Sequence, residues 1–282
     1  MTTPAPTRSP AFTGRTETVS SRDNRWLKMF RAALRGAGSL DEGVAAVEGA
    51  RLVDEALGSG LEVPAVLFSA SAEKHLTALE TRLPESARLL RVSDRLFQSV
   101  SGTQSPQGIA ALVHPRAAGF DALTRPSAGH PLVAVLVGVQ DPGNLGTVIR
   151  AAEAFGASGA IVTAGAAHPW SPKALRASAG STLRLPVVHG IAPPVALAQL
   201  RIAGFRTYAA STAGSALPSE VDLTAPVALL IGNEGAGLPP EIERSADSTL
   251  RIPLAAPVDS LNAAMAATVL LYEAARQRGF AP

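Results

Sequence analysis

The 282-residue sequence contains no cysteine. Disulfide bonds, thiolate metal ligands and a cysteine nucleophile are therefore excluded. The five histidines lack the i, i+3 or i, i+4 spacing of a helical metal-binding pair, so we expect no metal site. They are His75, His114, His130, His168 and His189.

Long hydrophobic runs are also missing. The apolar runs are strand-sized and fall short of the ~20 residues that a transmembrane helix needs, so we expect no membrane partner. Residues 1–10 are rich in Pro, Ser and Thr and lack the apolar core of a signal peptide, which favours a cytoplasmic location. We predict a disordered tail over residues 1–15.

Two nucleotide-binding fingerprints are absent as well. The chain has neither Gly-x-Gly-x-x-Gly after a strand nor Gly-x-x-x-x-Gly-Lys-Ser/Thr. Dinucleotide and P-loop sites thereby lose their main support.

Charge is small in total but uneven along the chain. The net charge is +2, and 46% hydrophobic residues with 17% charged residues indicate a globular protein. Residues 1–36 carry seven basic side chains against only Glu17 and Asp23. Such a segment suits a polyanion such as RNA, although a solvated helix face explains it equally well.

Hydrophobic periodicity predicts an α/β protein in two parts. In the first part we expect helices at 22–34, 48–57, 72–81 and 94–100, and strands at 44–47, 63–68, 89–92 and 109–113. In the second part we expect strands at 132–138, 159–163, 184–188, 205–209, 226–231 and 249–252, and helices at 144–155, 172–179, 192–203, 239–245 and 261–277. Regular alternation in the second part predicts a mostly parallel sheet covered on both faces. The predicted boundaries are a domain at 16–115, a linker at 116–130 and a domain at 131–282.

Three polar segments follow or nearly follow strands of the second part: 144–150, 232–238 and 260–262. The carboxyl ends of parallel strands form the usual ligand site of such sheets, so we expect the segments to build one site. Asn144 and Ser260 are suited to capping the helices that they precede.

Within these segments, Arg150 stands among apolar neighbours and is either extended out of the core or presented to an anion. Three glycines around Glu234 would let the backbone approach a ligand closely.

Taken together, the motifs resemble those of the SpoU (TrmH-like) branch of the SPOUT RNA methyltransferases. The shared patterns are Asn-x-Gly-x-x-x-Arg at Asn144, Gly-Asn-Glu-Gly-x-Gly-Leu at Gly232, and Ile-Pro-Leu with Ser-Leu-Asn from Ile252 to Asn262. The likeness covers about residues 131–278. The first part resembles the ribosomal-protein-like RNA-binding domain often fused to this enzyme, through segments such as 47–53 and 105–109. That domain often has basic residues before the Val-Glu-Gly segment. In this chain the corresponding residues 36–42 include no basic residue.

The resemblance implies a trefoil-knotted, mostly parallel α/β methyltransferase domain that works as a homodimer. It implies S-adenosylmethionine-dependent methylation of a ribose 2′-OH in structured RNA, and no DNA partner. The residues that it places in the polar catalytic set are Asn144, Arg150, Glu234 and Asn262. Those that it places around S-adenosylmethionine are Gly232, Ile252, Leu254, Ser260 and Leu261.

The substrate and the role of Arg150 stay open at this point. The first domain favours 23S ribosomal RNA, and transfer RNA is the closest rival. A non-catalytic RNA-binding or assembly factor with the same fold is the second hypothesis, and a small-molecule α/β enzyme is the third. The family assigns the base role to the counterpart of Arg150, but a guanidinium is always protonated. The alternative role of Arg150 is to bind the neighbouring phosphate and fix the ribose, with the hydroxyl proton leaving through Glu234 or water.

Overall fold

A computed structural model describes residues 15–36, 43–125 and 129–279. The chain divides between Arg116 and Ala117 into two compact units, which we call the N-terminal and the C-terminal unit. Residues 1–14, which are most of the predicted disordered tail, lie outside the described residues. So do residues 37–42, which belong to the segment before Val-Glu-Gly that has no basic residue. Within the described chain, no helix combines the length and apolarity required to cross a bilayer.

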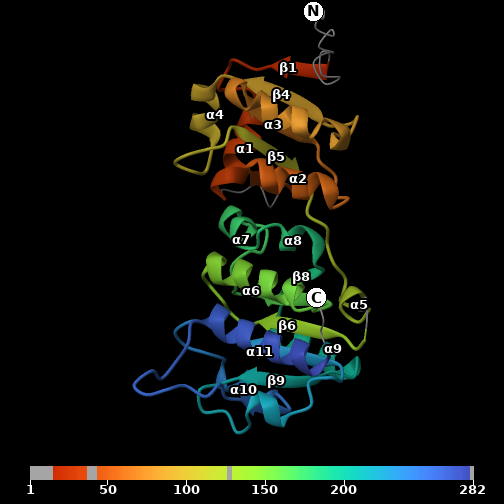
Figure 1. The fold of residues 1–282 in the computed structure, drawn as a ribbon, viewed down its shortest axis with the longest axis vertical. Helices are drawn as coiled ribbons and strands as arrows, with labels where there is room; N and C mark the ends of the chain where they lie inside the picture. Colours follow the sequence, from red (N-terminus) through yellow and green to blue (C-terminus); the bar gives the residue numbers. More distant parts are fainter. Residues whose placement is uncertain (1–14, 37–42, 126–128, 280–282) are drawn as a thin grey trace, which may run out of the picture. The chain divides into compact units, whose positions relative to one another are not determined.

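The N-terminal unit is a five-stranded sheet with helices on both faces (Figure 1). Its strands run in the order β1-β4-β3-β5-β2, with β1, β4 and β3 parallel and β5 antiparallel to both neighbours. The strands are β1 (Thr16–Thr18), β2 (Ala45–Glu48), β3 (Ala65–Ser69), β4 (Arg88–Val92) and β5 (Ile109–Val113). The helices are α1 (Arg25–Arg35), α2 (Ala50–Gly58), α3 (Glu73–Ala78) and α4 (Asp94–Val100), with short 3-10 turns η2 (Ala70–Ala72) and η3 (Glu80–Arg82).

Helix α1 shows how the sequence builds this unit. Asn24 caps it by accepting the Trp26 N–H at 2.8 Å, and Gly36 ends it in the left-handed conformation at φ 73°. Leu27, Phe30, Ala33 and Leu34 are buried on one side of the helix, which packs against β2 and α4.

Two features of this unit differ from the prediction. Strand β1 was not expected, because its three polar residues carry no period-2 apolar signal. The helix expected at 72–81 is interrupted, with α3 flanked by two 3-10 turns.

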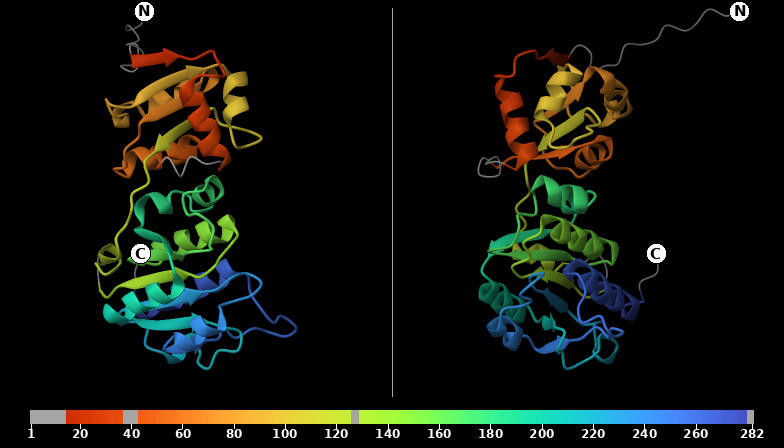
Figure 2. Two further views of the ribbon diagram at one scale, coloured as in Figure 1. Left: turned by 180° about the vertical axis from the view of Figure 1, so that it is seen from behind. Right: turned by 90° about the vertical axis from the view of Figure 1, so that its left-hand side faces the viewer.

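The C-terminal unit contains a six-stranded, wholly parallel sheet in the order β11-β9-β10-β6-β7-β8. Figure 2 shows helices on both sides of this sheet. The strands are β6 (Leu132–Leu136), β7 (Gly159–Thr163), β8 (Val187–Ile191), β9 (Arg206–Ala210), β10 (Val227–Ile231) and β11 (Ser248–Leu250). The helices are α5 (Phe120–Leu123), α6 (Pro142–Ala154), α7 (Pro172–Ala177), α8 (Ser181–Arg184), α9 (Pro193–Ile202), α10 (Pro240–Ser245) and α11 (Ala263–Gln277), with the 3-10 turn η4 (Pro218–Glu220).

Two apolar cores lie on opposite faces of this sheet. Strands β6 and β10 are fully buried, and their successive side chains point alternately into one core and the other. One core packs α6 and α11 against the sheet, and the other packs α5, α9 and α10. The α/β fold class with a mostly parallel, doubly covered sheet is therefore confirmed, while the trefoil knot stays a prediction.

Several predicted element ends were wrong, each for a local reason. Helix α6 begins at Pro142, because a proline suits the first helical turn and Asp141 caps it in place of Asn144. Asn262 caps α11 in place of Ser260, and α11 begins at Ala263. Residues 181–184 form α8, so the strand expected at 184–188 begins only at residue 187.

Helix α5 lies within the predicted linker at 116–130. Its Leu123 is fully buried in the core of the C-terminal unit. The predicted domain boundaries themselves stay predictions.

Candidate active site

A cavity of about 500 Å³ opens at the carboxyl ends of β9, β10 and β11. This is the position where open parallel sheets hold their ligands. All five residues predicted to surround the cofactor line it, together with Glu234: they are Gly232, Ile252, Leu254, Ser260 and Leu261. The cavity thus gathers two of the three polar segments, which are separated along the chain.

The glycine loop forms one wall of the cavity because its backbone folds back on itself. A Cβ added to Gly232 would lie 2.3 Å from the carbonyl carbon of Gly237, which leaves no space for any other residue. Gly237 itself has φ 67°, a conformation that favours glycine. Asn233 holds the turn by accepting the N–H groups of Gly235 and Ala236 at 2.9 and 3.0 Å.

The opposite wall is the segment from Ile252 to Leu261, which offers free backbone donors. No hydrogen bond within the described residues uses the N–H groups of Ile252, Leu254 or Leu261. Their side chains add an apolar surface to the same cavity. Apolar walls with a few unpaired backbone donors suit a flat heterocycle such as adenine, so the residues present fit the S-adenosylmethionine that the resemblance implies.

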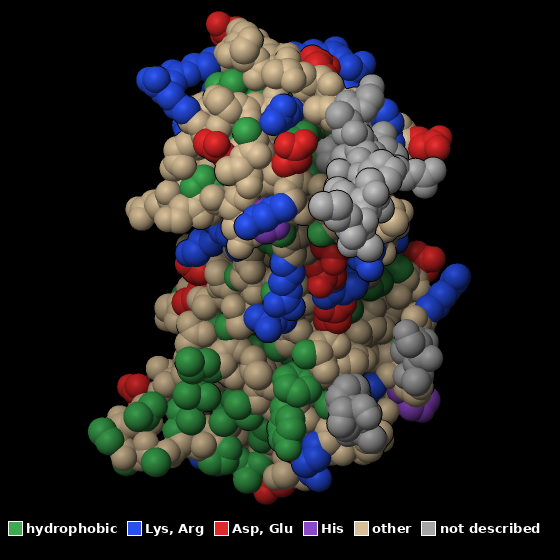
Figure 3. Space-filling view, turned by 45° about the horizontal axis from the view of Figure 1, so that its top comes forward, with side chains coloured by type: hydrophobic (Ala, Val, Ile, Leu, Met, Phe, Trp, Pro, Cys, Tyr) green, Lys and Arg blue, Asp and Glu red, His purple; other side chains and the backbone are tan. Residues whose placement is uncertain are grey.

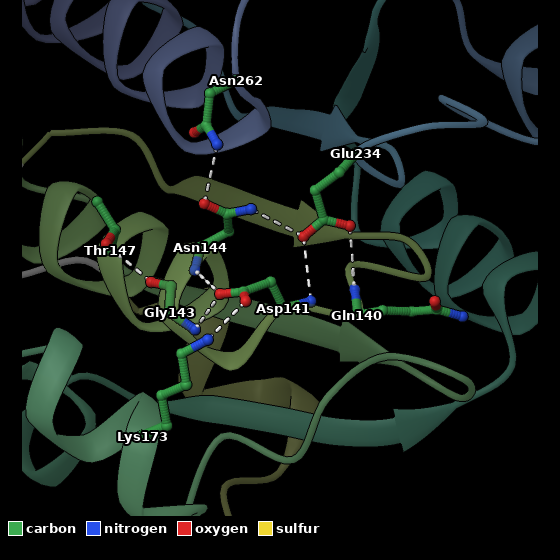
Figure 4. A network of polar contacts seen from close by, with 8 residues as sticks. All are labelled: Gln140, Asp141, Gly143, Asn144, Thr147, Lys173, Glu234 and Asn262. Carbon is green, nitrogen blue, oxygen red and sulfur yellow. Dashed lines mark hydrogen bonds and ion pairs between the residues drawn. The ribbon is translucent and has the colours of Figure 1, made fainter.

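Three of the four predicted catalytic residues meet beside this cavity, in one hydrogen-bonded row (Figure 4). Asn262 donates from Nδ2 to Oδ1 of Asn144 at 3.0 Å, and Asn144 donates from Nδ2 to Oε1 of Glu234 at 3.0 Å. An ionised carboxylate only accepts hydrogen bonds, so Glu234 fixes the orientation of both amides. The remaining oxygen of Asn262 accepts the Ala264 and Met265 N–H groups at the start of α11.

Both carboxylate oxygens of Glu234 are occupied by donors. Oε1 also accepts the Asp141 N–H at 3.1 Å, and Oε2 accepts the Gln140 N–H and Asn233 Nδ2, each at 3.3 Å. Desolvation raises the pKa of Glu234, but the hydrogen bonds from Asn144 and from the backbone outweigh it and lower the pKa below its usual value. Glu234 is therefore a weak base that joins the loop after β10 to the loop after β6.

Asp141 and Lys173 hold the backbone of Asn144 in place. Asp141 was not identified as a site residue from the sequence. Asp141 Oδ1 accepts the N–H groups of Gly143 at 2.6 Å and Asn144 at 3.0 Å, while its Oδ2 receives Lys173 Nζ at 2.6 Å. The hydrogen bond from Lys173 is the main reason that the pKa of Asp141 is lowered. The signal was present in Asp141-Pro142, since an acidic residue before proline is a strong helix start.

Arg150 is not brought to this group. It is exposed on α6, and no hydrogen bond or ion pair within the described residues holds it. Asn144 is six residues away, and a helix rotates by about 600° over that distance, so the two side chains leave different sides of α6.

The cavity also contains side chains that the sequence did not single out. Ser211 and Thr212 follow β9, and Glu243 and Asp259 add two carboxylates. A polar pair directly after a predicted strand could have indicated Ser211 and Thr212. Nothing in the local pattern distinguishes Glu243 from other helix carboxylates.

Comparison with known proteins agrees with this geometry. Residues 131–272 match the model of the SpoU rRNA Methylase family, and residues 40–111 match the MRM3-like substrate binding domain. The chain is 33% identical over 226 residues to the 23S rRNA (guanosine(2553)-2′-O)-methyltransferase RlmP of Bacillus subtilis, covering 80% of this chain and 86% of RlmP. It is 35% identical over 243 residues to a 23S rRNA (uridine(2479)-2′-O)-methyltransferase of Streptomyces viridochromogenes, covering 82% of each chain.

Solved structures give the same result. The SpoU methyltransferase AviRb of Streptomyces viridochromogenes in complex with AdoMet superposes with a TM-score of 0.82 at 31% identity, over 92% of this chain and all of AviRb. An AdoMet-bound rRNA methyltransferase of Sinorhizobium meliloti gives a TM-score of 0.80 at 32% identity, over 93% of this chain and 98% of the other. The expectation of an S-adenosylmethionine-dependent RNA methyltransferase is confirmed at the level of the family. This chain belongs to the SpoU rRNA Methylase family.

Proposed function

We propose that the protein transfers a methyl group from S-adenosylmethionine to a ribose 2′-OH of 23S ribosomal RNA. The observation that carries the proposal is the hydrogen-bonded row from Asn262 through Asn144 to Glu234 beside the cavity after β10. The named activities of RlmP and of the Streptomyces viridochromogenes enzyme support 23S rRNA as the substrate.

In this proposal the cavity residues hold the cofactor. The backbone donors of Ile252, Leu254 and Leu261 bind its heterocycle, and Gly232 and Ser260 border it. The bound cofactor supplies a methyl group already activated on a sulfonium, so the chain's own residues need only align the ribose oxygen and let its proton leave.

Asn144 is the residue best placed to align the ribose. One hydrogen of its amide binds Glu234, and the second is free to bind the substrate. Glu234 positions Asn144, because its four donors and lowered pKa make it a poor proton acceptor. The hydroxyl proton then leaves through water.

Arg150 acts in this proposal from a second copy of the chain. Arg150 is exposed on α6, and the neighbouring helix α11 presents an apolar stripe of Met265, Val269 and Tyr272, which are 63%, 41% and 55% exposed. Figure 3 shows hydrophobic side chains gathered on one face of the C-terminal unit. A homodimer that covers this stripe would let Arg150 of one chain bind a phosphate at the partner's cavity. An rRNA substrate also supports a cytoplasmic location.

The experiment is transfer of labelled methyl from S-adenosylmethionine to unmodified total rRNA and total tRNA, assayed separately, with Asn144→Ala as the control. Label in rRNA that is lost in the control is the expected result. Label in tRNA alone would support the proposed methyl transfer but would show that the substrate is tRNA and not rRNA. No label in either, with cofactor binding intact, would favour a non-catalytic RNA-binding factor.

A further inference from the structure

The helix α1 and the strand β1 precede residues 40–111, which match the substrate-binding domain, and α1 carries a stripe of positive charge. Its sequence contains four basic residues and no acidic one. They are Arg25, Lys28, Arg31 and Arg35. At 100° per residue Lys28, Arg31 and Arg35 fall within about 60° of one another, away from the side that is buried against β2 and α4.

Most of this charge is not neutralised within the described residues. Lys28 pairs with Asp23 at 3.4 Å, but both side chains are largely exposed, so water screens the pair. Arg35 donates to the carbonyl of Ser99 at 3.0 Å, which leaves its charge intact. Arg25 and Arg31 have no carboxylate partner in the described chain.

Trp26 orders two guanidinium groups at one end of the stripe. The Cζ atoms of Arg25 and Arg88 lie 5.1 and 5.8 Å from the centre of its ring. Arg88 lies on β4, next to β1, and its Nη1 forms an ion pair with Oε2 of Glu17 at 3.6 Å. A guanidinium held against an aromatic ring keeps its N–H edge free, and that edge matches a phosphate with two parallel hydrogen bonds.

We propose that a cationic surface, made by Arg25, Lys28 and Arg31 along α1 and by Arg88 of β4 beside Trp26, binds the phosphate backbone of the substrate RNA. The proposal rests on the proposed function for its substrate, and it assigns the contact mainly to α1, which lies outside the matched residues 40–111, with Arg88 of β4 inside them. Arginine outnumbers lysine in this cationic surface by three to one, which favours phosphates over a diffuse acidic surface, because arginine binds each phosphate in a fixed geometry. The structure thus favours RNA contact over a merely solvated helix face, the two readings that the sequence left equal.

The test measures RNA binding without methyl transfer. The dissociation constant of the full chain for a 23S rRNA transcript is measured over a salt series for the wild type and for the double variant Arg25→Gln, Arg31→Gln. Loss of two phosphate contacts should reduce the slope of log K against log salt by about 1.5 to 2 and weaken binding several-fold or more at low salt. The matched control is Lys74→Gln, Arg82→Gln, which removes the same charge from α3 and η3 on the other face of the sheet.

A second pair of variants tests the role of the ring. Trp26→Phe keeps an aromatic face and should keep the wild-type slope, whereas Trp26→Leu should lower the slope by up to about 1 as the two guanidiniums lose their support. Thermal unfolding of each variant shows whether the fold is intact. A double variant that folds and keeps the wild-type slope overturns the proposal, and so does a control that loses as much slope as the double variant. Either result leaves methyl transfer by the wild type unaffected, so failure of the proposed function is seen separately.

Discussion

Asn262 donates a hydrogen bond to Asn144 across 118 residues of sequence while its own carbonyl oxygen caps α11. The single side chain therefore links the helix that ends the C-terminal unit to the residue proposed to hold the ribose. Two functions, one structural and one chemical, rest on the two ends of one amide, and they can be separated by substitution.

Asn262→Asp should separate them. The carboxylate still caps α11, so the unfolding temperature should stay close to that of the wild type. It cannot donate to Asn144, so the rate of methyl transfer should fall at least tenfold. Asn262→Ala removes both roles and should also cost about 1 kcal/mol of stability. An aspartate variant with wild-type activity would show that the amide–amide bond is dispensable.

Glu234→Gln should reduce activity to the same extent at every pH between 5 and 9. The pKa of Glu234 is lowered in the folded protein, so its carboxylate is ionised throughout that range. Its contribution to stability is present above the unfolded pKa of about 4.3 and is lost as pH falls through the folded value. Measurement of kcat/KM against pH for both proteins checks this. A wild-type acid limb that disappears in the glutamine variant would make Glu234 the base.

Lys173→Met should lower kcat several-fold with little change in the affinity for S-adenosylmethionine. Lys173 holds Asp141, which fixes the backbone of Asn144, and neither side chain lines the cavity. Lys173→Arg keeps the ion pair and should recover most of the activity. The control is Lys74→Met, which removes a lysine from the N-terminal unit. Equal losses in the methionine and arginine variants would contradict a positioning role.

Arg278→Ala should destabilise the C-terminal unit by about 2 kcal/mol and leave cofactor binding intact. The half-buried guanidinium donates to the carbonyls of Leu223 at 2.8 Å, Ala225 at 2.7 Å and His130, and it thereby ties the end of α11 to two loops. Burial lowers the pKa of Arg278, and the nearby Asp222 opposes that shift. Denaturant unfolding measures the change, and a loss below about 0.5 kcal/mol would show that water replaces these bonds freely.

The sequence was most informative where local and long-range signals coincide. Strand β10 and the glycine loop were predictable because a buried apolar run is followed by a cluster of glycines, of which Gly232 leaves no space for a Cβ. Strand β1 was not predictable, because its place in the sheet depends on its partner β4 and not on its own residues.

The same limit applied to the site. Its members could be named from three segments, but their roles depended on distances between residues about 90 or more positions apart. The sequence allowed Glu234 to be a proton acceptor, and only the four donors around it indicate a positioning role. Arg150 likewise belonged to the catalytic set by its motif, yet its place on α6 keeps it apart from the other three residues.

Mixing two inactive variants tests whether Arg150 acts across a dimer. Arg150→Ala and Asn144→Ala chains are each expected to be inactive alone. If each site takes Asn144 from one chain and Arg150 from the other, a heterodimer of the two variants contains one intact site. Random exchange of equal amounts should then restore about a quarter of the wild-type activity, since half of the dimers are mixed and each has one intact site of two.

The control for this mixture is a dimerisation variant, Met265→Asp with Val269→Asp, placed on the apolar stripe of α11. Charges there should prevent association, which analytical ultracentrifugation measures, and should abolish the recovery of activity on mixing. No recovery from mixed, demonstrably exchanged dimers would mean that Arg150 serves the site of its own chain. That outcome would require α6 to turn Arg150 toward its own cavity when RNA binds, because in the structure its side chain leaves a different side of the helix from Asn144.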